Sequence, residues 1–305
     1  MFSRILIVSL LISLAGGCST TGFAYRNADW FIERYARQAV DASAGQRERW
    51  EPVVQATLQQ HREEILPLLI AYLDRLDQVV QTPQDRSGVE CLVNGALRLY
   101  DRHAELAVKL SAPLLAELDS GQIEHLAAHL AERQIELRER YRLPDPQRRH
   151  AARVERITGR IERWTGRLTD AQQEQVERVI RRMPDLTGQW LAYRARQNDE
   201  LLQRLAAGAN ETALQAFLFS WWVERAGQPP EMAQRGETAM RDFIALLQSL
   251  GSSLTDRQHA TLGTRIADLR KDLAATQKKL SELEKLDQQA VAMLKQLETE
   301  NSDLQ

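Results

Sequence analysis

The chain has 305 residues, of which 43% are hydrophobic and 27% are charged, and this balance indicates a folded protein rather than a disordered one. Its formal net charge of −2 excludes the broadly basic character of proteins that bind nucleic acid or acidic membranes through charge alone. With only 15 Gly and 9 Pro, and no alternation of apolar and polar residues long enough for a strand, the sequence predicts an all-α protein.

Residues 1–17 have the pattern of a cleaved targeting segment, which takes no part in the fold. Arg4 supplies a positive start, and Ile5 to Ala15 form an apolar run that is too short to cross a bilayer as a helix. Leu14-Ala15-Gly16-Gly17-Cys18 then resembles the lipobox of bacterial lipoproteins, although Ala15 stands where lipoboxes favour Leu. The alternative is an ordinary secretory signal followed by a coincidental cysteine.

The lipobox resemblance implies a covalent lipid on Cys18, with diacylglycerol on its sulfur and a further acyl chain on its new amino group. No other cofactor is expected. Ser19, the next residue, resembles the choice that sorts such proteins to the outer membrane. Because several acyl chains hold a protein stably on a bilayer, we expect residues 18–26 to form an anchor and tether at the periplasmic face of the outer membrane.

The body opens with Tyr25-Arg26-Asn27-Ala28-Asp29-Trp30, which leads into a helix. This opening, together with Met183-Pro184-Asp185 and Trp190 further along, resembles a family of uncharacterised Gram-negative lipoproteins known only as a domain of unknown function. The resemblance covers roughly residues 18–265. It implies helices that begin with capping boxes and an Arg-bearing helix between two halves, and it brings no known activity.

The first half of the body is assigned to residues 27–142. Pro67 should start or kink its second long helix, Pro83 should separate the second from the third, and Pro113 should break the chain before the fourth. After the opening helix, the long helices are expected at about 46–62, 64–81, 86–111 and 120–142.

Cys91 lies in the third of these helices, between Val89 and the pair Leu92 and Val93. Such neighbours predict a buried, small hydrophobic side chain. An intermolecular disulfide or a redox role is the alternative.

Four short motifs have the form of a capping box, in which a side-chain oxygen accepts from the first turn of a helix and a Gln three residues later bonds back. Positions 43 and 119 are 76 residues apart, and positions 169 and 255 are 86 residues apart. This regularity predicts a tandem duplication, and therefore an elongated multi-helix bundle of two related halves. The motifs pair Thr169 with Gln172, Thr255 with Gln258, Asp119 with Gln122 and, more weakly, Ser43 with Gln46.

Residues 143–167 are expected to form an Arg-rich helix that connects the halves. Its core-facing stripe contains Val154, Ile157, Ile161, Trp164 and Leu168. Six arginines recur one residue earlier, about 100° round the helix, and we call them the Arg ridge: Arg149, Arg153, Arg156, Arg160, Arg163 and Arg167. The ridge can grip acidic segments or lipid phosphates, or it can be a border that pairs with carboxylates of neighbouring helices.

The second half, residues 168–270, repeats this plan. Asn210 should cap one of its helices, and Pro229-Pro230 forms a joint. Between them lies the densest group of aromatic residues, the aromatic cluster, which is either core or an apolar groove for unfolded or amphipathic partners. Its members are Phe217, Phe219, Trp221 and Trp222. Helices are expected at about 170–183, 185–207, 211–226 and 231–250, and from 255 onward.

From Leu262 to Leu304 the apolar residues follow a heptad, which predicts a long, coiled-coil-like C-terminal helix. Residues 271–305 also differ from the body in charge, because they contain five Lys and no Arg. Asp287 and Asn301 interrupt the apolar seam. The helix can pair in a homodimer through residues 262–304, or it can stand in solvent and pack only at its start.

No sequence motif nominates a catalytic site, since there is no glycine-rich phosphate loop and no nucleophile elbow. His125 and His129 form a histidine pair at ligand spacing, with Glu132 and Glu136 further along the same face, but no cysteine cluster or third histidine accompanies them. The sequence therefore predicts neither an enzyme nor a metal site.

The Leu-Thr-x-x-Gln motifs that begin at Leu168 and Leu254 resemble the periplasmic LTxxQ stress-protein family. That resemblance implies a helical cradle that holds unfolded clients without ATP. Together with the anchor, it predicts a non-catalytic, chaperone-like lipoprotein that binds a protein partner or an unfolded client, and no nucleic acid. The alternative is a structural or adaptor protein of the envelope that acts through its C-terminal coiled coil.

Overall fold

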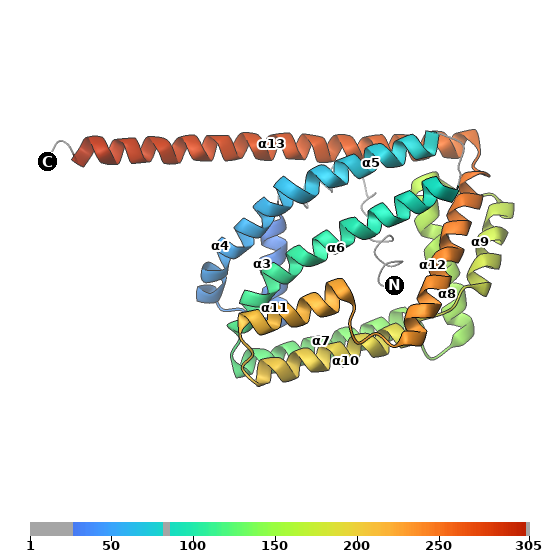
Figure 1. The fold of residues 1–305 in the computed structure, drawn as a ribbon, viewed down its shortest axis with the longest axis horizontal. Helices are drawn as coiled ribbons and strands as arrows, with labels where there is room; N and C mark the ends of the chain where they lie inside the picture. The colour runs from blue at the N-terminus through green and yellow to red at the C-terminus, as the bar shows by residue number, and fades with distance from the viewer. Residues whose placement is uncertain (1–26, 82–85, 303–305) are drawn as a thin grey trace.

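The computed structural model describes residues 27–81 and 86–302, and every element in that part of the chain is a helix (Figure 1). The all-α prediction is confirmed. Cys18, Pro83 and Leu304 lie outside the described residues, as do the side chains of Asp287 and Asn301. Within the described ranges, no helix is both long and apolar enough to span a membrane.

The helices follow the predicted order along the chain. In the first half they are α3 (Ala28–Val40), α4 (Ala44–Gln60), α5 (Leu66–Gln81), α6 (Arg86–Ala116) and α7 (Ser120–Arg140). After these come α8 (Pro146–Thr165), α9 (Asp170–Arg182), α10 (Thr187–Ala206), α11 (Glu211–Phe219), α12 (Pro230–Gly251) and α13 (Asp256–Ser302). Two π-helical turns, η1 (His61–Ile65) and η2 (Ser220–Glu224), follow α4 and α11.

Side-chain caps start the helices at the places that the sequence indicates. Ser43, Asp119 and Thr169 each accept a bond from the Gln three residues later and complete a capping box. Thr255 has the same two bonds with Gln258, at 2.9 and 3.3 Å. Asn210 caps α11 through the amide of Ala213, as predicted.

Two local predictions are wrong. Pro113 does not break the chain, because α6 continues to Ala116. A proline near the end of a helix removes only one backbone bond, and the adjoining Ala112 is buried at 1% exposure, so packing holds this last turn in place. Cys91 is exposed although Val89 and Val93 are buried, because a helical residue two positions away points to the opposite side.

Two four-helix units lie at opposite ends of the molecule, joined by α5 and α6 (Figure 1). The first unit contains α3, α4, α7 and the C-terminal part of α6; the second contains α8, α9, α12 and the start of α13. In the first, α3 packs on α4 and α7 while α4 packs on α6. In the second, α8 packs on α9 and α13 while α9 packs on α12. The pairing of helices is therefore the same in both units.

Each unit has its own apolar core. Trp50, Val108 and Leu126 lie in the core of the first unit, which extends to Leu214 and Leu218 of α11. The core of the second unit is larger; it extends to the N-terminal part of α6 and includes Val176, Ile180, Ala239, Phe243 and Leu246.

A third core fixes the start of α13. Ile266, Leu269 and Leu273 are buried against α5 and against Trp164 of α8. The first heptads of the predicted coiled-coil helix are thus covered by the protein's own body.

Candidate functional site

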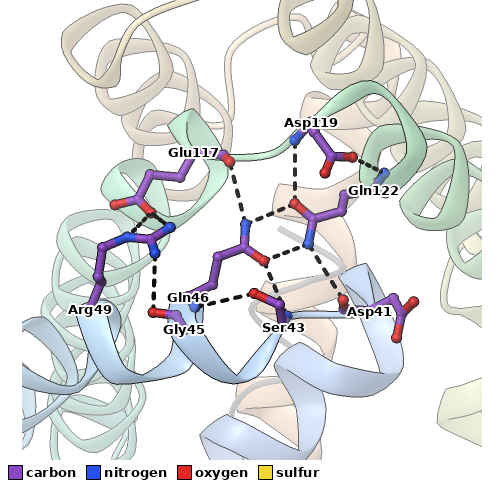
Figure 2. A network of polar contacts seen from close by, with 8 residues as sticks. All are labelled: Asp41, Ser43, Gly45, Gln46, Arg49, Glu117, Asp119 and Gln122. Atoms are coloured by element: carbon purple, nitrogen blue, oxygen red, sulfur yellow. Dashed lines mark hydrogen bonds and ion pairs between the residues drawn. The ribbon is translucent and has the colours of Figure 1, made fainter.

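The capping-box glutamines of the first unit bind each other (Figure 2). The amide nitrogen of Gln46 donates to Oε1 of Gln122 at 2.8 Å, and that of Gln122 donates to Oε1 of Gln46 at 2.7 Å. Each amide nitrogen also donates to a backbone carbonyl, of Glu117 and Asp41 respectively, at 3.4 Å. The amide oxygens accept from the backbone of Ser43 and Asp119 as well. We call this arrangement the first glutamine pair.

The second unit contains the same arrangement, which we call the second glutamine pair. Gln172 and Gln258 exchange hydrogen bonds of 3.0 and 2.9 Å. Their amide nitrogens donate further to the carbonyls of Ser253 at 2.8 Å and Arg167 at 2.9 Å. The four helix-cap motifs predicted from the sequence are therefore joined in two buried contacts.

The glutamine pairs are structural. Each amide oxygen accepts two bonds and each amide nitrogen donates two, so the groups hold no spare capacity for a ligand. A fully bonded buried network specifies one arrangement of the elements that carry it. The sequence predicted each capping motif but not that the glutamines bind each other in pairs. The only sequence feature that pointed to this pairing was the similar spacing of the two partners, 76 and 86 residues.

The Arg ridge is divided by the fold. Arg149 pairs with Asp185 at 2.6 Å, and Arg153, with 6% exposure, donates to the carbonyls of Met183 and Pro184 at 3.0 and 3.1 Å. Burial alone would raise the pKa of Asp185, but hydrogen bonds from Thr187 and Arg149 outweigh it and the pKa lies below its usual value. These two arginines hold the Met-Pro-Asp segment between α9 and α10.

The remaining ridge residues have other surroundings. Arg156 lies over the ring of Tyr141 at 4.8 Å, and Arg160 lines an apolar cavity beside α5 and α13. Arg163 and Arg167 are exposed. The six side chains therefore do not form one continuous binding surface.

The four residues of the aromatic cluster also have different surroundings. Phe217, Trp221 and Trp222 pack against the core of the first unit, while Phe219 is 39% exposed. The change from α11 to the π-helical turn η2 alters the helical register between Phe219 and Trp221. Trp221 and Trp222 also line a cavity at the start of α12.

Two histidines that the sequence did not nominate lie together between α4 and α6. Nε2 of His61 is 3.1 Å from Nε2 of His103, and Nδ1 of His103 is 2.6 Å from the carbonyl oxygen of Leu99. Burial, then His103 and Arg62, lowers the pKa of His61 to about 4. His125 instead contacts the carbonyl of Gln38. No group of three or more metal-binding side chains occurs among the described residues.

The far part of α13 leaves the body. The helix runs back along α5 and extends past the rest of the ribbon (Figure 1). Five large apolar side chains on it are 45 to 64% exposed, in contrast to Leu273 at 2%: Leu283, Leu286, Val291, Met293 and Leu294.

A family model described as a family of unknown function, DUF6279, matches residues 38–220. The match covers the first three cap motifs and ends before α12 and α13. No curated protein and no solved structure matches the chain.

Proposed function

The chain belongs to DUF6279, a family of unknown function, and we propose that it is a non-catalytic, lipid-anchored adaptor of the periplasm. Its binding element is the projecting part of α13, residues 277–302, and the partner is a helix of another protein or of a second copy. The observation that carries this proposal is the set of exposed apolar side chains on that part of the helix.

The exposed residues have the arrangement of a helix-binding stripe. At 3.6 residues per turn, Leu283, Leu286, Met293 and Leu294 fall within about 100° of arc. An amphipathic helix with such a stripe typically lies in an apolar groove or pairs with another helix. The body of the protein buries the apolar seam of α13 only as far as Thr276, and the stripe lies beyond that stretch, turned about 90° round the helix from the buried residues.

The lipid anchor remains a proposal, with support from α3. Trp30, Phe31 and Tyr35 are 46, 44 and 61% exposed on the helix that follows the tether. Trp and Tyr are favoured at the boundary between lipid and water, so α3 is suited to a position against the membrane that holds Cys18. Labelled palmitate should be incorporated by the native protein and not by Cys18→Ala; incorporation into that variant would overturn the anchor.

The binding role is tested by photo-crosslinking in cells. A photo-reactive residue at Leu286 or Met293 should give a specific crosslinked product, whereas one at Ala292, on the opposite side of α13, should not. Leu286→Glu combined with Met293→Glu should abolish the product, and Ala292→Glu should leave it. Equal crosslinking from both sides would refute the stripe as a binding surface, and light scattering separates a homodimer from a complex with another protein.

Client holding is a second candidate, motivated by the resemblance of the motifs at Leu168 and Leu254 to the LTxxQ family. We place the main contact on α13 instead, because three of the four aromatic-cluster residues pack against the core. Suppression of client aggregation that survives removal of residues 277–305 would favour client holding over the adaptor role.

A further inference from the structure

A cavity of about 250 Å³ lies between α6, α10, η2 and the start of α12, away from the stripe on α13. Five aromatic side chains line it: Tyr100, Trp190, Tyr193, Trp221 and Trp222. It is a separate feature from the proposed adaptor surface, and no step of that proposal depends on it.

The walls of this aromatic cavity are fixed by the fold. Met232, at 1% exposure, and Tyr193, at 7%, are held in the body of the protein. The Tyr193 hydroxyl donates to the carbonyl of Ala226 at 2.9 Å and so fixes the loop that leads to α12. The rings of Trp221 and Trp222 are 5.9 Å apart and inclined at 55°. Their faces are therefore positioned before any ligand arrives.

Arg225, which lines the aromatic cavity, is fixed by its backbone conformation and by its side-chain contacts. It adopts a left-handed backbone conformation, with φ of 62°, at the end of the π-helical turn η2. Such strain in a residue other than glycine persists where the surroundings enforce it, and it is frequent at binding sites. Its guanidinium pairs with Asp101 at 2.7 Å and lies over Tyr100 at 5.4 Å. Its Nη1 also donates to the carbonyl oxygen of Val223 at 2.6 Å, so the guanidinium is fixed in the wall of the cavity.

Arg194 supplies the second guanidinium of the cavity. It lies over the ring of Trp190 at 5.8 Å. Burial lowers its pKa, Tyr35 opposes that shift, and Arg133 adds to it. Asp101 neutralises Arg225, whereas no carboxylate among the described residues forms an ion pair with Arg194. The cavity is therefore electropositive.

We propose that the aromatic cavity binds a sugar that carries a carboxylate. The C–H face of the sugar ring packs on a tryptophan face, and the carboxylate pairs with Arg194. The amide of Gln228 bonds to a hydroxyl at the edge of the ring.

The chemistry of the lining excludes other ligand classes. The positive charge of Arg194 repels a cationic ligand, although aromatic walls alone would attract one. A purely apolar ligand would cover the Arg194 guanidinium and the Gln228 amide without giving them partners, which is unfavourable. An anion with an apolar face and hydroxyl groups at its edge can contact the aromatic rings, the arginine and the Gln228 amide at once. Charge-assisted bonds to Arg are strong and directional.

Calorimetric titration of the purified full-length protein tests the proposal. The probes are glucuronic acid and N-acetylmuramic acid, with glucose and N-acetylglucosamine as neutral sugars and benzoate as an acid without a sugar ring. The two acidic sugars should bind at least tenfold more tightly than the neutral ones, and benzoate should bind more weakly than either acid. Equal affinity for acidic and neutral sugars, tighter binding of benzoate, or no binding by the folded protein would overturn the proposal.

Two variants and a control locate the site. Arg194→Gln should remove the preference for acidic sugars. Gln228→Ala should lower the affinity for acidic and neutral sugars alike. Arg196→Gln changes an exposed residue of the same helix and should bind as the native protein does. If Arg194→Gln fails to fold, the Gln228→Ala titration still decides: unchanged affinity in that variant places the sugars elsewhere and contradicts the site. Crosslinking through α13 is a separate readout, so either proposal can fail alone.

Discussion

The second glutamine pair is more deeply buried than the first and makes shorter bonds to the backbone. Gln172 and Gln258 are 3 and 5% exposed, and Gln46 and Gln122 are both 8% exposed. The bonds from the amide nitrogens to backbone carbonyls measure 2.8 and 2.9 Å in the second pair but 3.4 Å in both cases in the first. The same network thus serves two purposes: it secures α13 firmly to the body, and it closes the first unit more loosely. The following predictions test this difference.

Gln172→Leu should have the largest effect, a loss of about 3 kcal/mol in the free energy of unfolding. It removes one of the two bonds at each polar atom of the buried Gln258 amide and the bond to the carbonyl of Ser253, and each unmet group is costly. Urea denaturation followed by circular dichroism measures the loss. Gln173→Leu, a partly exposed neighbour, should change stability by less than about 0.5 kcal/mol. The double variant with Gln258→Leu should lose less than the sum of the single losses, because the two residues share one contact.

Acidification from pH 6.5 to pH 4 should lower the free energy of unfolding by about 2 kcal/mol. The first unit should be destabilised before the second. The pKa of His61 is lowered to about 4 in the folded state, so in this range the unfolded state binds the proton more readily and stability falls as pH falls. Amide exchange measured across this range should rise in α4 and not in α9. His61→Gln should remove this pH dependence; its persistence in that variant would assign the effect to another group.

Gln46→Leu should cost about 1 to 2 kcal/mol, less than Gln172→Leu, because its network is partly exposed and its longest bond is weak. The two variants are compared in the same denaturation experiment. A loss equal to that of Gln172→Leu would show that the two units have equal strength in spite of their geometry.

Asp185→Asn should give the smallest effect, a loss of stability at neutral pH that disappears under strongly acidic conditions. The folded-state pKa of Asp185 is lowered, so its contribution to stability is present at neutral pH and is lost only as pH falls below the usual carboxyl range, about pH 4. In that range the variant should lose less stability on acidification than the native protein does. The same loss of stability in the variant as in the native protein would mean that the ionised carboxylate of Asp185 adds nothing to stability.

Local signals in the sequence predicted most helix boundaries, because caps such as Thr169 with Gln172 and Asn210 act within a few residues. Long-range pairing was not predictable in the same way. The distance of 42 residues between His61 and His103 hid their contact, and nothing near Arg153 shows that its guanidinium reaches the carbonyls of Met183 and Pro184. Pro113 was misjudged because burial of the neighbouring Ala112 overrides a local rule.

The direction of α13 has a mechanical consequence. The helix starts at the second unit and runs back along α5 toward the end of the molecule that contains α3 and α4 (Figure 1). Tension between a partner on the free end of α13 and a membrane at α3 would act along the helix axis. It would load Ile266, Leu269 and Leu273 together in shear against α5, instead of peeling them away one turn at a time.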